Sequence, residues 1–87
     1  MLQLEIISPD ETLFSGNVKL VQVPGQKNPF TVLNNHDRII SSLIKGKVRI
    51  VDMADKTRFF EIGGGVVEVN NNKIIILVDS LNTNPGK

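Results

Sequence analysis

Residues 21–46, VQVPGQKNPFTVLNNHDRIISSLIKG, contain the alternation of apolar runs and turn residues that decides the fold of this chain. One apolar run ends at Pro24-Gly25, and a second, shorter run from Phe30 to Leu33 ends at Asn34-Asn35. Proline cannot donate to a strand ladder, and glycine and asparagine accept the backbone conformations of tight turns. We therefore expect short strands joined by turns, with the only histidine of the chain, His36, in one of the turns.

The segment from His36 to Lys45 is the one ambiguous part of this stretch. Asp37 is a residue type that caps helices, and the aliphatic residues after it have helical spacing, namely Ile39, Ile40, Leu43 and Ile44. However, the run is short for a helix and has turn residues on both sides. We predict an irregular turn that leads into a short strand.

The residues before this stretch predict a meander of short strands. Leu2 to Ile6 alternate apolar and polar residues, as in a half-buried strand, and Ser8-Pro9-Asp10 ends that strand. A second strand is expected at Thr12–Ser15, ended by a turn at Gly16-Asn17, and a third at Val18–Val23.

The residues after the stretch predict further strands, at Lys47–Met53, Thr57–Ile62, Val66–Val69 and Lys73–Val78. The last two are joined by Asn70-Asn71-Asn72, which favours a left-handed turn. Every residue from Ile74 to Val78 is apolar, so we expect both faces of that strand to be buried. The fold class is all-β, a small β-sandwich or flattened barrel of about eight to ten short strands without a substantial helix. We expect one domain over residues 1–80 and a flexible tail at residues 81–87.

Length and composition narrow the function classes. A chain of 87 residues with 40% hydrophobic and 22% charged residues is an ordinary small globular domain. A net charge of +1 argues against nucleic-acid binding, which requires clustered basic residues, and the absence of cysteine excludes disulfides and thiolate metal sites. No apolar run approaches the ~20 residues of a membrane helix, and the start of the chain lacks signal-peptide features. We expect a cytosolic protein, or one that is peripheral to a membrane through a partner.

No set of residues forms a recognisable catalytic, cofactor or metal site. His36 has no partner other than the adjacent Asp37, so a structural or interface role is favoured over a ligand contact or a pH-sensitive role. Gly63-Gly64-Gly65 precedes a predicted strand instead of a helix, which favours a hairpin or a strand bulge over a phosphate loop. Ser41-Ser42 has no nearby base, and no paired carboxylates are present. The four phenylalanines, at 14, 30, 59 and 60, are expected to form part of the core.

Several short motifs follow one another along the chain: Ile7-Ser8-Pro9-Asp10, Phe14-Ser15-Gly16, Val23-Pro24-Gly25, Phe30, Val32-Leu33, His36, Ile39-Ile40, Gly46 with Val48-Arg49-Ile50, Phe59, Gly64-Gly65 with Val66-Val67-Glu68-Val69, and Ile76-Leu77-Val78-Asp79. In this order they resemble the N-terminal β-sandwich of the epsilon subunit of F-type ATP synthase, from about Leu2 to Asp79. Most members of that family continue into a two-helix C-terminal domain. The sequence stops before such a domain, as either a naturally short form or a truncated chain would.

The resemblance implies a non-catalytic subunit of the central stalk, or rotor, of a proton-translocating ATP synthase. Such a subunit couples the gamma subunit to the membrane ring of c subunits during rotary ATP synthesis, and needs no cofactor. It would lie on the cytoplasmic side of the bacterial inner membrane as a peripheral protein, through the complex alone.

The same resemblance implies two contact surfaces. The surface toward the c-ring comprises Gln26, Lys27, Asn28, Pro29, Asn34 and Asn35, and the surface toward gamma comprises His36, Ile39, Ile40, Ser41 and Leu43. From the residues alone, the aliphatic members of the second group can equally be core or interface. Two other functions stay open: a small β-barrel module that binds an oligonucleotide or sugar, which a basic groove around an exposed Phe59 or Phe60 would favour, and an enzyme fragment or regulatory subunit of a metabolic enzyme.

Overall fold

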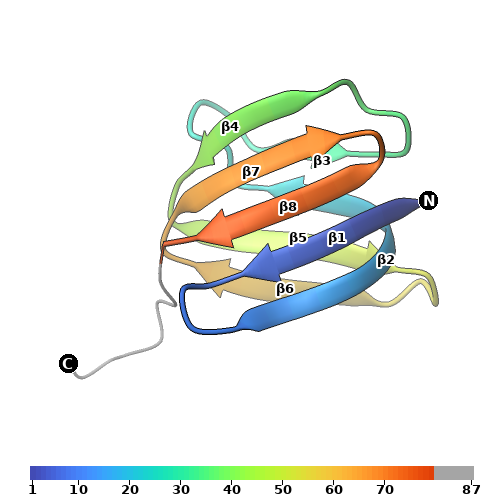
Figure 1. Cartoon of the computed structure of the whole chain (residues 1–87), viewed down its shortest axis with the longest axis horizontal. Coiled ribbons are helices and arrows are strands. Elements are labelled where there is room, and N and C mark those ends of the chain that lie inside the picture. Colours follow the sequence, from blue (N-terminus) through green and yellow to red (C-terminus); the bar gives the residue numbers. More distant parts are fainter. Residues whose placement is uncertain (80–87) are drawn as a thin grey trace.

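The computed structural model describes residues 1–79, which form eight β-strands joined by turns and short loops (Figure 1). The strands are β1 (Leu2–Ile7), β2 (Thr12–Val23), β3 (Phe30–Val32), β4 (Ile39–Leu43), β5 (Gly46–Asp52), β6 (Thr57–Ile62), β7 (Gly65–Asn70) and β8 (Lys73–Val78). Residues 1–79 contain no helix, which confirms the predicted all-β class. The predicted tail at residues 81–87 lies outside the described residues.

The strands form two layers that share β2. Strand order along the sheet is β4-β7-β8-β1-β2-β5-β6, and β3 also pairs with β2. Residues of β2 up to Val18 pair with β1, whereas its last residues pair with β5 on one side and with β3 on the other. The register with β5 shifts between Val18 and Leu20, where an irregularity bends the strand from one layer into the other. In Figure 1, β4, β7, β8, β1 and the start of β2 form the front layer, with β3, β5 and β6 behind.

The first and last strands lie side by side in the middle of the front layer. β1 and β8 run parallel, with Leu4 opposite Ile74 and Ile6 opposite Ile76, and β8 pairs with β7 along its other edge. The fold therefore closes only when the two ends of the described chain have come together.

The core lies between the layers and is made by the inward-facing residues of alternating strands. Alternate residues of a strand point to opposite faces, so an apolar residue at every second position is enough to fill the space. The fully or almost fully buried members are Leu2, Leu4, Ile6, Val18, Val21, Val23, Val32, Leu43, Val48, Ile50, Ile62, Val67, Val69, Ile74, Ile76 and Val78.

Several turn predictions are confirmed. Asn71 and Asn72 have φ angles of 51° and 61°, as the predicted left-handed turn between β7 and β8 requires. The ambiguous segment is irregular as far as Arg38 and then forms β4, as predicted.

Three predictions about strands and core were wrong. The turn predicted at Gly16-Asn17 is absent, because Gly16 pairs with Leu4 and Asn17 with Gln3 in one continuous strand of 12 residues. Pairing with β1 along this segment overrides the local preference of glycine and asparagine for turns.

The strand β8 is not buried on both faces, because Leu77 is 51% exposed on the outer face of the front layer. The prediction that all four phenylalanines form part of the core is wrong for Phe59 alone, since the other three pack against the core. Phe59 is 59% exposed, and the other three are half-buried at the margins of the core. Aliphatic side chains fill the interior instead.

Candidate partner-binding surfaces

The loop between β2 and β3 is fastened to the end of β4. Gly25 pairs with Leu43 in an isolated bridge, the amide of Gln26 donates to the carbonyl of Ser42 (3.0 Å), and the amide of Ile44 donates to the carbonyl of Pro24 (2.9 Å). A β-carbon on Gly25 would lie 2.5 Å from the carbonyl oxygen of Asn28, so the tight path of this loop requires glycine. The loop thus presents its tip, residues 26–29, on a fixed base.

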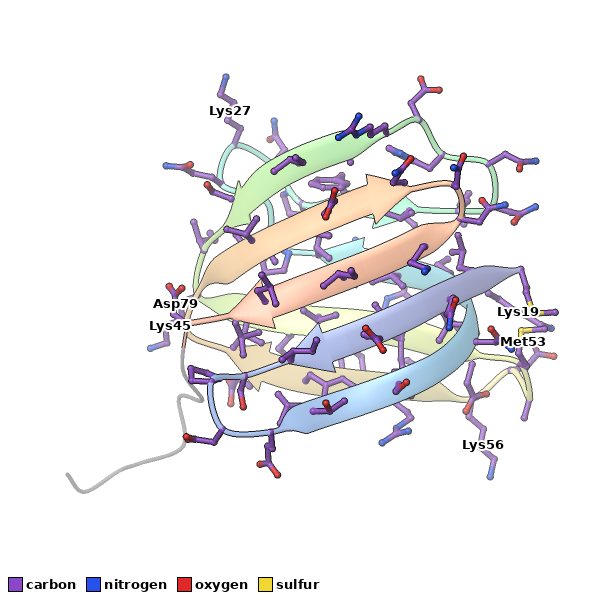
Figure 2. All side chains as sticks on the ribbon, in the orientation of Figure 1. Lys19, Lys27, Lys45, Met53, Lys56 and Asp79 are labelled. Atoms are coloured by element: carbon purple, nitrogen blue, oxygen red, sulfur yellow. The ribbon has the colours of Figure 1, made fainter. Side chains whose placement is uncertain are left out.

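Every residue of this tip, Gln26 to Pro29, is exposed. Figure 2 shows Lys27 projecting from the loop at the same end of the sandwich as Lys45 and Asp79. The tip therefore offers a polar, cationic projection for contact with another molecule.

The turn at Asn34-Asn35 lies at the opposite end of β4 and is held by a pair of asparagines. The amide of Asn35 donates to Oδ1 of Asn72 (2.6 Å), and Nδ2 of Asn72 donates to Oδ1 of Asn35 (3.3 Å). The amino group of Met1 donates to Oδ1 of Asn34 (3.1 Å). The structure therefore separates the six residues predicted to face the c-ring into two groups, the loop tip and this turn, at the two ends of β4.

His36 lies between these two groups. Its ring stacks on Phe30, with centroids 6.5 Å apart and an interplanar angle of 29°, and its Nδ1 lies 2.8 Å from the carbonyl oxygen of Asp37. The side chain is half-buried. These contacts fit the structural or interface role that was favoured for His36, and they position the turn against the start of β3.

Two shallow hollows open next to His36, which lines both. One, of about 530 Å³, is lined by Gly25, Gln26, Lys27, Asn28, Phe30, His36, Ile39 and Ser41. The other, of about 380 Å³, is lined by Asn35, His36, Asp37, Arg38, Asn70, Asn71 and Asn72. Residues of both predicted contact groups thus line the first hollow together, and His36 separates it from the second.

The strand β4 divides the group predicted to face gamma. Leu43 is only 6% exposed and belongs to the core, and Ile39 is half-buried against the core. Ile40 points to the outer face and is 63% exposed. The question that the sequence left open therefore has a different answer for each residue: Leu43 is core, and Ile40 is available for an interface.

Ile40 belongs to an apolar patch on the outer face of the front layer that the sequence did not predict. Val66, Leu77 and Ile7 lie opposite one another across β7, β8 and β1, and Ile75 lies on the same face beside Leu77. We call Ile7, Ile40, Val66, Ile75 and Leu77 the front patch. Glu68 separates Ile40 from Ile75, and Glu5 flanks Ile75 on its other side. The uninterrupted apolar sequence of β8 was the signal for this surface, since it marked an outer face that needs covering.

The remaining candidate sites have structural roles. A β-carbon on Gly65 would lie 2.1 Å from the carbonyl oxygen of Leu77, so glycine at this position permits a close approach of β7 to β8. The predicted hairpin or bulge is absent, because Gly65 pairs with Leu43 and Val78 without a register shift and β6 does not pair with β7. Asp52 accepts hydrogen bonds from the amides of Ala54 and Lys56, both at 2.9 Å, and closes the β5–β6 turn. Asp55 pairs with Lys19 at 2.6 Å. Within residues 1–79, no group of acidic, histidine or cysteine side chains could hold a metal ion.

Phe59 is the feature that bears on a nucleic-acid-binding function. It is exposed, and Nζ of Lys47 lies 5.8 Å from the centre of its ring. However, Phe59 lies on the outer face of the β5–β6 ladder with Glu61 beside it, and it lines neither of the two hollows described above. A stacking platform needs a basic groove that follows the phosphates, and this mixed-charge strand face does not provide one.

Residues 1–83 match the family model described as the ATP synthase delta/epsilon chain, beta-sandwich domain. The chain belongs to this family. The predicted resemblance is thereby confirmed over almost the whole sequence.

Similar proteins of known identity belong to the same family. The chain is 38% identical over 78 residues to the ATP synthase epsilon chain of Caulobacter vibrioides, covering 90% of each chain. It is 37% identical over 79 residues to the epsilon chain of Chlorobaculum tepidum, covering 90% of this chain and 89% of the relative. The epsilon chain of Maricaulis maris is 38% identical, but only 58% of its length is covered. The family therefore includes both chains of about this length and longer ones.

Solved structures share the fold. A chain of the Euglena gracilis mitochondrial ATP synthase, in a complex described as OSCP/F1/c-ring, superposes with a TM-score of 0.84 at 20% identity, over 88% of this chain and 49% of that one. A chain of the Tetrahymena thermophila mitochondrial ATP synthase central stalk and c-ring gives a TM-score of 0.77 at 14% identity. The superposition covers 99% of this chain and 73% of that one. These similarities establish the sandwich fold.

No helix within residues 1–79 is long and apolar enough to span a membrane.

Proposed function

We propose that this chain is a non-catalytic subunit of the central stalk of a proton-translocating ATP synthase, where it joins the gamma subunit to the c-ring. Membership of the delta/epsilon family is the observation that carries this proposal. A compact sandwich with two contact surfaces, which adjoin at the hollow that residues of both line, suits the transmission of rotation.

The surface proposed for gamma is β4 together with the front patch. Ile40 supplies the exposed apolar contact, His36, Ile39 and Ser41 line the adjoining hollow, and Leu43 fixes β4 to the core. Ile40, Leu77 and Val66 are 63%, 51% and 39% exposed, so a partner that covers them removes apolar surface from water, which favours binding. Glu5 lies at the margin of this patch, whereas Glu68 lies within it, between Ile40 and Ile75.

The surface proposed for the c-ring is the exposed tip at Gln26, Lys27, Asn28 and Pro29, with Asn34 and Asn35 as a second contact at the far end of β4. Its polar character suits the polar loops that a ring of membrane helices exposes to water. Backbone hydrogen bonds hold the loop tip to β4, and a hydrogen bond to Asn72 holds the turn at Asn35. These bonds support a role in transmitting torque, because a loop without them would deform when force is applied to it.

As a member of this family, the chain is associated with an energy-transducing membrane complex. We further propose that it lies at the cytoplasmic side of a bacterial inner membrane, held there by its partners.

Affinity capture tests the proposal. The chain is immobilised and incubated with detergent-solubilised membranes in which the synthase is intact, and retained subunits are identified by mass spectrometry. Gamma and c subunits should be recovered, and Ile40→Asp should reduce the recovery of gamma at least tenfold, because it places a charge in an apolar interface. Met53→Asp, at a side chain that is 45% exposed in the β5–β6 turn, is the matched control and should bind normally.

Failure to recover either subunit would contradict the rotor function. Equal loss of gamma with both variants would contradict the assignment of β4 while leaving the rotor function intact.

A further inference from the structure

The outer edge of β6 belongs to neither of the two surfaces that the proposed function uses. β6 ends the strand order, and no other strand in the described part of the chain pairs with its outer edge. At the opposite end of the order, the bridge between Gly25 and Leu43 and the hydrogen bond from Gln26 to Ser42 cover the last two residues of β4. An unpaired strand edge exposes a row of amide and carbonyl groups that can accept a further strand.

The edge of β6 is regular enough for pairing. All six residues from Thr57 to Ile62 pair with β5 without a register shift, and the strand contains no proline. Beside it, aromatic and cationic side chains connect β6 to β2. Phe14 and Phe60 meet edge to face with centroids 5.9 Å apart, and the guanidinium of Arg58 lies 5.2 Å from the first ring and 5.3 Å from the second.

The order of side chains along β6 limits which strand can be added. Two antiparallel copies of one strand are related by a twofold axis perpendicular to the sheet, so opposite residues lie on the same face. With Phe59 on the axis, Phe59 faces its own copy, Thr57 faces Glu61, and Arg58 faces Phe60. Each is a favourable cross-strand pair: two aromatic rings, a hydroxyl donor with a carboxylate, and a cation with a ring.

The neighbouring registers are worse. With Arg58 on the axis, two guanidinium groups would oppose each other, and with Phe60 on the axis, the carboxylate of Glu61 would face the ring of Phe59. The edge is therefore self-complementary in one register only.

We propose that a second copy of this chain docks on β6, in an antiparallel pairing centred on Phe59, and joins the two back layers into one continuous sheet. This dimer leaves the front patch free, so it does not depend on the rotor function.

A charge exchange at Thr57 tests the register. In the dimer, Thr57→Lys places an ammonium group opposite Glu61 of the other copy, at two symmetric positions, whereas Thr57→Glu places two carboxylates there. Sedimentation velocity of the full chain over about a hundredfold range of concentration, in a buffer of low ionic strength, measures the monomer–dimer equilibrium. The wild-type chain should shift from monomer to dimer as its concentration is raised. Thr57→Lys should tighten the dimer severalfold, and Thr57→Glu should weaken it by a similar factor.

A second variant tests the centre of the interface. Phe59→Lys should abolish the dimer because it places two ammonium groups on the axis, while Leu33→Lys, a comparably exposed position beyond β3, should leave the dimer unchanged. Circular dichroism confirms that each variant is folded. A wild-type chain that stays monomeric up to its solubility limit would overturn the proposal. So would a dimer that survives Phe59→Lys, or one that responds equally to both substitutions at Thr57.

Discussion

At the start of β7, the backbone of Gly65 passes so close to β8 that a β-carbon would meet the carbonyl oxygen of Leu77 at 2.1 Å and the α-carbon of Val78 at 2.9 Å. Both are backbone atoms, which cannot move aside without distorting a strand in the centre of the front layer. The sequence Gly63-Gly64-Gly65 predicted a tight connection here, but only the pairing of β7 with β8 identifies Gly65 as the residue that must lack a side chain.

Gly65→Ala should therefore destabilise the fold by roughly 2–4 kcal/mol, through backbone strain and not through loss of contacts. Gly16→Ala is the control, because a β-carbon at Gly16 meets only the ring of Phe14 at an ordinary 3.6 Å. It should change the stability by less than about 0.5 kcal/mol. Urea unfolding followed by circular dichroism measures both free energies of unfolding. Equal effects of the two substitutions would show that the strand can shift to accommodate the extra carbon.

At the scale of the element, the five residues of β4 include one that is buried in the core, Leu43, and one that we propose for the interface, Ile40. Leu43→Ala removes a side chain that is only 6% exposed and should destabilise the chain by about 2–4 kcal/mol. Ile40→Ala removes one that is 63% exposed and should cost less than about 0.5 kcal/mol in urea unfolding, yet weaken capture of gamma. A stability loss at Ile40 as large as that at Leu43 would place Ile40 in the core and remove it from the proposed interface.

Some of the strands could be predicted from the sequence and others could not. Alternation of apolar residues correctly located β1 and β5, because each has one face in the core and its pattern is local. The turn residues at 54–56 located β6. The same kind of signal failed for β2, where pairing with β1 holds Gly16 and Asn17 in a continuous strand. The apolar sequence of β8 wrongly predicted that both its faces are buried. An outer face looks the same in the sequence whether the chain itself covers it or leaves it exposed. The front patch is thus a property of the topology, which local patterns do not contain.

At the scale of the whole molecule, stability depends on the pairing of the two ends of the described chain. β8 lies between β7 and β1 and contributes Ile74, Ile76 and Val78 to the core. A sheet that loses a central strand loses the ladder hydrogen bonds on both sides together with the apolar surface. Folding should consequently be all-or-none, and slow for the size of the chain, because contacts between residues distant in sequence must form before the core is closed.

Two shortened chains test this dependence and the proposed domain boundary at residue 80. A chain of residues 1–80 keeps all the buried residues named above, and the bond from the amide of Asp79 to the carbonyl of Gly64, so its free energy of unfolding should be within about 1 kcal/mol of that of the full chain. A chain of residues 1–72 lacks β8 and should be unfolded in the absence of urea. Circular dichroism and amide NMR dispersion distinguish these outcomes. A larger loss in the first chain would assign residues 81–87 a part in the fold, and a folded second chain would mean that β1 and β7 can close the front layer without the strand between them.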